Sequence, residues 1–256
     1  MKKCIAALLC ALLFISCCAA LAEDKPLAGK TLTVALSPNF MYFETVSDTD
    51  PTGYEGLDID VIKRLSEELG FDFKIEPMDF SSLIGALQTG NADFVISGMS
   101  YSDERAQAVD FSITYATTDV GCITLIDSDI NSVEDLAGKT VCCSQGTTYE
   151  GLIEAMENVT KVTYNGQAAV GQAVAQGSDG VAAGLTSVNG SKKLSNELLD
   201  AEGNPLLRYF VLEGDVADQY NIAFPKGSEL VPLFDSAIQS MIDSGELGEM
   251  IKSWLY

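Results

Sequence analysis

Short apolar segments and amphipathic helical segments alternate along the first hundred residues. Residues 31–36 predict a strand, and residues 56–70 predict a helix whose apolar side chains recur four positions apart. Residues 71–76 alternate apolar and polar side chains, 81–90 predict a short helix, and 92–97 predict a buried strand. This strand-helix-strand-helix-strand order is typical of an α/β fold with a parallel sheet, and it argues against a sandwich or a helical bundle.

The same alternation starts again after residue 120. The predicted strands are 121–126, 140–144, 180–185 and 221–224, and the predicted helices are 149–156 and a clear amphipathic one over 230–242. No Pro/Ser-rich linker separates the two halves, so the chain is expected to cross directly from one lobe to the other. Small molecules bind such sheets in the crevice outside the carboxyl ends of the parallel strands.

Charge and composition exclude several functions. The chain has 37 acidic against 15 basic residues, a net charge of −22, and such a surface repels the phosphates of nucleic acids. Histidine is absent from the sequence, which removes Ser-His-Asp and Cys-His catalysis and every His-ligated zinc site. We therefore expect no metal, no cofactor and no nucleic-acid partner.

The first 22 residues predict a signal peptide. Two lysines precede the apolar run 5–15, and Ala20-Leu21-Ala22 is a small-x-small cleavage site. Ser16-Cys17 offers a second route, a lipoprotein cleavage that leaves an acylated Cys17. Either route places the mature protein outside the cytoplasm, in the periplasm or on the outer face of the cell membrane.

Three cysteines remain beyond this leader, namely Cys122, Cys142 and Cys143. We expect them to be small, buried, apolar side chains. The alternative, in an oxidising compartment, is one disulfide bridge from Cys122 to Cys142 or Cys143.

The run from Ser97 to Arg105 carries the clearest binding signal. A strand ends at Ser97, Gly98 allows close approach of a ligand to the backbone, and Ser102 can cap the following helix. Arg105 lies about one turn into that helix and can hold a carboxylate through two parallel N–H bonds.

Several motifs together resemble a known family. They are 53–60 (GYEGLDID), 77–80 (PMDF), 97–100 (SGMS), 103–105 (DER), 109–112 (VDFS), 136–141 (LAGKTV), 146–149 (GTTY) and 222–228 (IAFPKGS). In this order they are similar to the polar amino acid-binding proteins of ABC transporters, the extracytoplasmic solute-binding proteins of family 3. The resemblance covers residues 28–256.

The resemblance implies a two-lobed, type II periplasmic-binding-protein fold, each lobe a mainly parallel sheet flanked by helices. Lobe one would comprise 28–115 plus 221–256, and lobe two 120–215, joined by crossing strands at 115–119 and 216–220. The implied function is binding of a small carboxylate-bearing solute, an amino acid first, for uptake by an ABC importer. The protein would be a monomer, would not be an enzyme, and would deliver its ligand to a membrane permease. A sensor that signals to a partner protein and a dehydratase-like enzyme on the same scaffold are the alternatives.

The resemblance also implies site residues. Arg105 would hold the ligand α-carboxylate with Ser100, through its hydroxyl and backbone N–H, and Thr148 would donate its backbone N–H once the cleft closes. Ser97 or Gly98 would offer backbone contacts to the α-amino group. Phe40 and Phe80 would form aromatic walls. Core packing of the two phenylalanines and a simple helix cap at Thr148 are the alternatives.

The sequence departs from the family where an acid usually pairs with the ligand ammonium group. We expect that position to fall on Gly184, so either another acid, Glu44 or Asp119, replaces it, or the ligand has no ammonium group. Ser37 and Ser144 are expected to enlarge the pocket without charging it.

Overall fold

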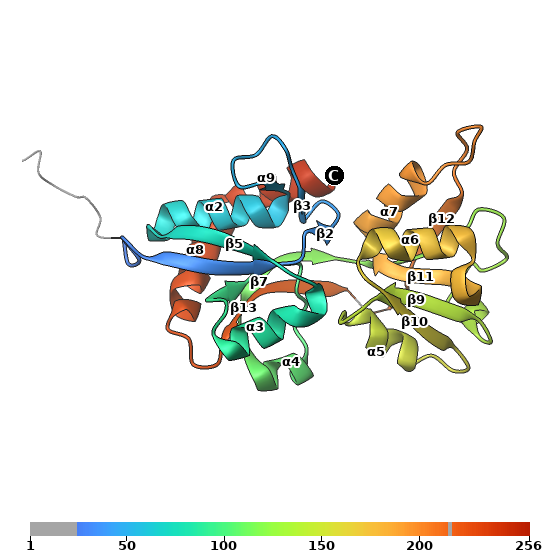
Figure 1. Ribbon diagram of the computed structural model, residues 1–256, viewed down its shortest axis with the longest axis horizontal. Coiled ribbons are helices and arrows are strands. Elements are labelled where there is room, and N and C mark those ends of the chain that lie inside the picture. Colours follow the sequence, from blue (N-terminus) through green and yellow to red (C-terminus); the bar gives the residue numbers. More distant parts are fainter. Residues whose placement is uncertain (1–24, 215–216) are drawn as a thin grey trace, which may run out of the picture.

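In the computed structural model, which describes residues 25–214 and 217–256, the strands form two five-stranded sheets and one small three-stranded sheet. The leader 1–22 and Cys17 lie outside the described residues. Figure 1 shows two lobes side by side, each built around one of the large sheets. The predicted two-lobed α/β architecture is confirmed.

The sheet of lobe one has the order β5-β1-β6-β13-β7. Its strands are β1 (Thr31–Leu36), β5 (Asp72–Pro77), β6 (Phe94–Val95), β7 (Val109–Thr118) and β13 (Asp218–Pro225). β1 pairs in parallel with β5 and β6, while β13 runs antiparallel to β6 and β7. The sheet is therefore mixed, with its parallel part in the half that the first hundred residues form.

The sheet of lobe two has the order β10-β9-β11-β8-β12. Its strands are β8 (Val120–Leu125), β9 (Thr140–Ser144), β10 (Thr160–Tyr164), β11 (Val181–Ser187) and β12 (Leu207–Val211). β9 runs parallel to β10 and β11, whereas β8 runs antiparallel to β11 and β12. A three-stranded sheet of β2 (Asn39–Phe40), β3 (Glu44–Val46) and β4 (Tyr54–Glu55) follows β1.

Helices cover both faces of each large sheet. They are α2 (Leu57–Leu69), α3 (Leu83–Thr89), α4 (Asp103–Ala108), α5 (Tyr149–Glu154), α6 (Gln167–Gln176), α7 (Val188–Glu197), α8 (Leu230–Ser244) and α9 (Glu246–Leu255), with short 3₁₀ turns η1 (Phe80–Ser82), η2 (Glu134–Leu136) and η3 (Ser178–Gly180). Within the described residues, no helix is both long and apolar enough to span a bilayer.

Helix ends follow the signals in the sequence. Gly70 and Gly90 end α2 and α3 with positive φ values of 83° and 72°, a conformation that glycine adopts at little cost. Ser102 caps α4, because its hydroxyl accepts a hydrogen bond from the backbone N–H of Arg105 at 3.2 Å. This cap fixes Arg105 in the first turn of α4.

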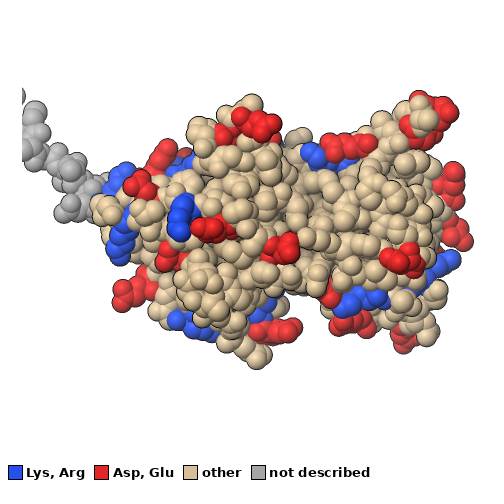
Figure 2. Space-filling view, in the orientation of Figure 1, with Lys and Arg blue, Asp and Glu red and all other residues tan. Residues whose placement is uncertain are grey.

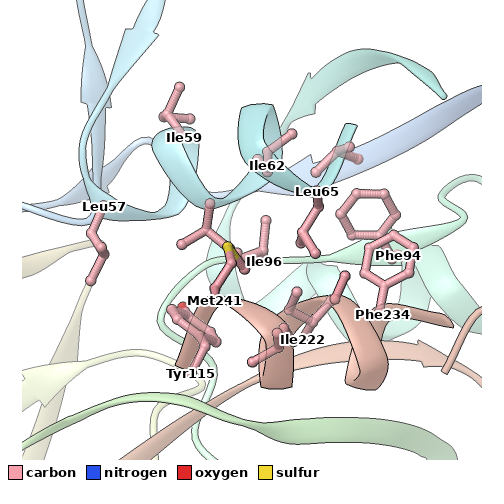
Figure 3. Packing of buried hydrophobic residues seen from close by; sticks show 14 of the residues in the cluster. Leu57, Ile59, Ile62, Leu65, Phe94, Ile96, Tyr115, Ile222, Phe234 and Met241 are labelled. Atoms are coloured by element: carbon pink, nitrogen blue, oxygen red, sulfur yellow. The ribbon is translucent and has the colours of Figure 1, made fainter. Parts of the chain in front are cut away.

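The main core lies in lobe one between its sheet and the helices α2, α8 and α9. Figure 3 shows Leu65 of α2 directed toward Phe234 and Met241 of α8, beside Phe94 of the sheet. These side chains are buried, and burying each contributes about 1.5–3 kcal/mol relative to leaving it exposed. Lobe two has a separate core on each face of its own sheet.

The three cysteines are free and buried, so the alternative of a disulfide bridge is wrong for this structure. Cys122 lies on β8 and the other two on β9, and β11 separates these strands. Cys122 and Cys143 pack into one core and Cys142 into the other. Burial raises the pKa of all three thiols to about 12.

The chain crosses between the lobes beside paired strands. β7 ends at Thr118 and β13 begins at Asp218, its direct partner in the ladder, so most of the predicted crossing segments belong to the sheet of lobe one. Asp119 alone separates β7 from β8. The return crossing follows β12, and its residues 215–216 are not among those described.

Candidate functional site

A cavity lies where the lobes meet, at the carboxyl ends of β1, β6 and β9. Lobe one lines it with Asn39, Phe40, Phe80, Ser97, Gly98, Ser100, Arg105 and Tyr220, and lobe two with Ser144, Thr147, Thr148, Tyr149, Gly166 and Gln167. Of the predicted site residues, all but Ser37 and Gly184 line this cavity.

Arg105 carries the only charge among the described residues that line the cavity. Its Nη1 donates to the carbonyl of Ser100 at 2.5 Å, and its Nη2 donates to the carbonyl of Gly146 in lobe two at 2.8 Å. Burial lowers the pKa of Arg105, and the charge of Asp218 opposes this shift. A guanidinium has five N–H groups, so these two bonds leave donors for an anion.

Aromatic rings form the walls on the lobe-one side. The ring of Phe40 stacks on Phe43 at 4.5 Å and meets Tyr220 edge-on at 5.7 Å. Phe80 lies in η1 with its ring centroid 5.5 Å from the guanidinium carbon of Arg105. Both phenylalanines are half-buried and face the cavity as well as their neighbours.

Gly98 allows the ring of Phe40 to lie directly against the backbone of the cavity lining. It has a φ of +49°, and a Cβ built on it would lie 2.1 Å from the Cε1 atom of Phe40. The backbone N–H of Gly98 donates to Oδ2 of Asp58 at 2.8 Å. This N–H therefore points away from any ligand, and what Gly98 offers the cavity is its surface.

Two buried carboxyl groups, those of Glu44 and Asp58, lie behind the lining residues Ser97 and Gly98. The hydroxyl of Ser97 donates to Oε1 of Glu44 at 2.5 Å, and Tyr115 donates to Oδ1 of Asp58 at 2.7 Å. Burial raises the pKa of Glu44 well above its ordinary value, with the Asp58 charge adding to the shift. Burial also raises the pKa of Asp58 to about 6, against the hydrogen bonds it accepts. Both shifts favour one proton held between the two carboxyl groups, with Glu44 binding it more firmly than Asp58.

A third buried carboxylate, Asp218, gathers the hydroxyl groups of the site. Ser100 donates to its Oδ1 at 2.7 Å and Thr148 at 3.2 Å, while Tyr149 donates to its Oδ2 at 2.6 Å. The hydroxyl hydrogens of Ser100 and Thr148 therefore point to Asp218 in this structure, and the backbone N–H groups of both residues remain the expected contacts to a ligand carboxylate. The hydroxyl of Thr148 does not cap α5.

Sequence reasoning missed Asp218. The only signal was its position as the first residue of β13, the strand that follows the return crossing between the lobes. That signal is weak, because the chain has 37 acidic residues.

The expectation for Gly184 is wrong. Gly184 is an internal residue of β11, and a Cβ on it would lie 2.8 Å from Cγ1 of Val170, in the core beneath α6. β11 continues for three more residues, so Ser187 stands at the strand end. The hydroxyl of Ser187 accepts from the Nε2 of Gln167 at 3.2 Å and from the N–H of Gly190 at 3.1 Å.

The other predicted residues outside the lining have clear positions. Ser37 is buried behind Asn39, donates its hydroxyl to the Oδ1 atom of Asn39 at 3.2 Å, and does not reach the cavity. Glu44 is covered by Ser97, and Asp119 is exposed near the crossing. Neither alternative acid lines the cavity.

The two lobes are closed upon each other around this cavity. Asn165 of lobe two donates to Oδ1 of Asp79 at 2.8 Å and accepts from Nδ2 of Asn39 at 3.3 Å. Gln167 accepts from the backbone N–H of Met41 at 3.3 Å. With the bond from Arg105 to Gly146, these contacts hold lobe one against lobe two.

Comparisons with known proteins agree with this architecture. The sequence model of the bacterial extracellular solute-binding proteins, family 3, matches residues 32–256. The arginine-binding extracellular protein ArtP of Bacillus subtilis is 30% identical over 251 residues, covering 96% of this chain and 94% of ArtP. A solved ancestral arginine-binding protein bound to arginine is 29% identical with a TM-score of 0.78, covering 88% of this chain and 98% of that one.

A second solved structure is that of the ancestral amino acid-binding protein AncCDT-1, described as a precursor of cyclohexadienyl dehydratase. It is 27% identical with a TM-score of 0.76, covering 88% of this chain and 96% of that one.

Proposed function

The chain belongs to the bacterial extracellular solute-binding proteins of family 3, and on that premise we propose that its interlobe cavity binds an α-amino acid with an uncharged side chain. Arg105 would hold the α-carboxylate. Oxygen atoms of the lining, such as the hydroxyl of Ser144 and the amide of Gln167, would accept from the α-ammonium group. Phe40 and Phe80 would pack against the side chain.

The observation that carries this proposal is the charge of the lining. Arg105 is its single charged group, and none of the described lining residues is acidic. A ligand with a cationic side chain would bury a second positive charge without a carboxylate to pair with it, at a cost of several kcal/mol. Relatives such as ArtP are named for arginine binding. Within the described part of the chain, the lining of this cavity has no carboxylate that could pair with the guanidinium of a bound arginine.

Closure of the lobes supplies the affinity. In the closed state Arg105 contacts both lobes, so a carboxylate beside it exchanges water for a guanidinium that the fold already orients. Lobe one (28–115 plus 221–256) and lobe two (120–215) would rotate about 115–119 and 216–220. A membrane permease of an ABC importer would then receive the ligand from the closed form. The chain would act as a monomer outside the cytoplasm, either in the periplasm or anchored through Cys17.

Calorimetry with L-citrulline and L-arginine tests the ligand class. The two molecules have nearly the same shape, but citrulline carries a neutral ureido group in place of the guanidinium. We expect citrulline to bind at least about tenfold more tightly than arginine, because an unpaired buried charge costs more than 1.4 kcal/mol. Tighter binding of arginine, or no thermal shift with any of the standard amino acids or citrulline, would overturn the proposal.

We also propose that the chain binds its ligand without converting it. The lining offers no carboxylate, histidine or lysine as a general acid or base among the described residues, and the buried acids behind it contact lining groups instead. Because AncCDT-1 is described as the precursor of an enzyme, this point needs its own test. A cyclohexadienyl acid and the bound amino acid should be recovered unchanged after prolonged incubation with the protein, as followed by NMR.

A further inference from the structure

Asp218 occupies an unusual place in the fold. It is the first residue of β13, directly beside the return crossing between the lobes, and its side chain is only 6% exposed. It does not line the ligand cavity, although the residues that donate to it do. Its carboxylate therefore accepts hydrogen bonds from lining residues without facing the cavity itself.

The donors to Asp218 come from both lobes. Ser100 and Tyr220 belong to lobe one and donate at 2.7 and 3.4 Å. Thr148 and Tyr149 begin α5 of lobe two and donate at 3.2 and 2.6 Å. A carboxylate has about four lone-pair positions, so these four hydroxyls satisfy it fully without solvent.

Both groups of donors are fixed to their own lobes. The ring of Tyr149 is 5% exposed and packs into the core of lobe two with Ile153. Tyr220 is 1% exposed and packs into the core of lobe one. When the lobes move apart, Tyr149 and Thr148 must leave with lobe two, and Asp218 keeps only the donors of lobe one.

We propose that Asp218 is a positioning residue that stabilises the closed arrangement by accepting hydrogen bonds from both lobes beside the hinge. Bonds from a hydroxyl to a carboxylate are about twice as strong as neutral ones, and burial excludes the water that would compete for them. The contacts form outside the cavity, so this contribution to closure is independent of which ligand binds. The inference rests on the hinge closure of the family and not on the proposed ligand class.

The population of the closed form in ligand-free protein tests this role. Spin labels on the mature protein at Gln88→Cys in α3 and Glu157→Cys after α5 report the distance between the lobes, since both sites are exposed and their helices flank the cleft. We expect Asp218→Asn to lower the ratio of closed to open molecules by about tenfold, the loss that 1.4 kcal/mol produces.

Asp119→Asn is the matched control. Asp119 lies at the other crossing, is exposed, and loses the same charge on substitution, so the distance distribution should stay that of the parent protein. If Asp119→Asn opens the lobes as much as Asp218→Asn does, general charge repulsion accounts for the effect and the proposal fails.

A third variant, Tyr149→Phe, keeps the fold and removes one donor from lobe two. It should also shift the population toward the open form, and it should add little when combined with Asp218→Asn, because both changes break the same bond. An unchanged distance distribution in Tyr149→Phe would overturn the proposal even if Asp218→Asn failed to fold. Because no ligand is present, a failed search for the ligand leaves this test unaffected.

Discussion

Replacing Glu44 with glutamine should change how the stability of the protein depends on pH. Glu44 is fully buried, accepts a hydrogen bond from Ser97, and lies against Asp58. Its second oxygen, Oε2, has no donor among the described residues. This arrangement suits a protonated Glu44 that donates to an ionised Asp58. A glutamine amide has the same shape, can donate to Asp58 and accept from Ser97, and needs no proton to do so.

The sign of the effect follows from the direction of the pKa shift. The pKa of Glu44 is raised in the folded protein, while in the unfolded chain it is about 4.3. Folded Glu44 therefore holds a proton that the unfolded chain releases. The resulting stabilisation is complete below about pH 4 and is lost as the pH rises toward the folded pKa.

The size of the effect is about 1.4 kcal/mol for each pH unit, because one proton is linked to unfolding. Above about pH 7, Asp58 is largely ionised, so the further change comes mainly from Glu44. From pH 7 upward, for as long as folded Glu44 keeps its proton, the wild-type protein should lose about 1.4 kcal/mol of stability per pH unit relative to the Glu44→Gln variant.

Urea denaturation at half-unit steps from pH 6 to 8 measures this difference. Glu157→Gln is the matched control, because Glu157 is exposed and the substitution removes the same carboxylate. The control should follow the wild-type curve, and the difference between Glu44→Gln and wild type should grow with pH. Parallel curves for all three proteins would refute the shared proton.

Three further outcomes are expected. Arg105→Lys should weaken binding of citrulline by at least about tenfold, because an ammonium cannot form two parallel bonds to a carboxylate, and calorimetry would show this. Gly98→Ala should cost about 1–3 kcal/mol of stability, since its Cβ would meet Phe40 at 2.1 Å, whereas Gly90→Ala, with a similar positive φ of 72° and open space around it, should cost only the backbone strain. Gly184→Asp should destabilise the protein by more than about 3 kcal/mol in thermal or chemical unfolding, with no gain in affinity for any amino acid, because the carboxylate would lie in the core.

Strands, helices and helix ends could be predicted from the sequence, because neighbouring residues determine them. The alternation of apolar residues indicated most elements of the first hundred residues, and Gly70, Gly90 and Ser102 marked helix ends that the structure contains. The strands and helices of 160–176 and 188–211 were not predicted. α6 is rich in small residues, so its packing against the sheet leaves little trace in the pattern.

The site could be predicted only where neighbouring residues act together. Ser97 to Arg105 form one segment, so their convergence on the cavity followed from their order. The pairing of Glu44 with Asp58, and of Asp218 with residues of two lobes, joins positions far apart in the chain that only the fold brings together. The error at Gly184 arose from the length of β11, which extends to Ser187 past the predicted end.

The three buried carboxyl groups together explain how a cavity without acids can still accept an ammonium group. Each accepts hydrogen bonds from lining residues, which then donate away from the cavity. The hydroxyl of Ser97 donates to Glu44, and the N–H of Gly98 donates to Asp58. The hydroxyl of Ser100 donates to Asp218. Donors that point outward leave lone pairs and carbonyl oxygens facing inward. The buried acids then act on the ligand through these oxygens and not by direct contact, while Arg105 offers charged donors to an anion. Under the proposed function, this division suits a zwitterion with its carboxylate at Arg105 and its ammonium group against the neutral oxygens. On the face that Figure 2 shows, acidic side chains stand on the outer surface of both lobes.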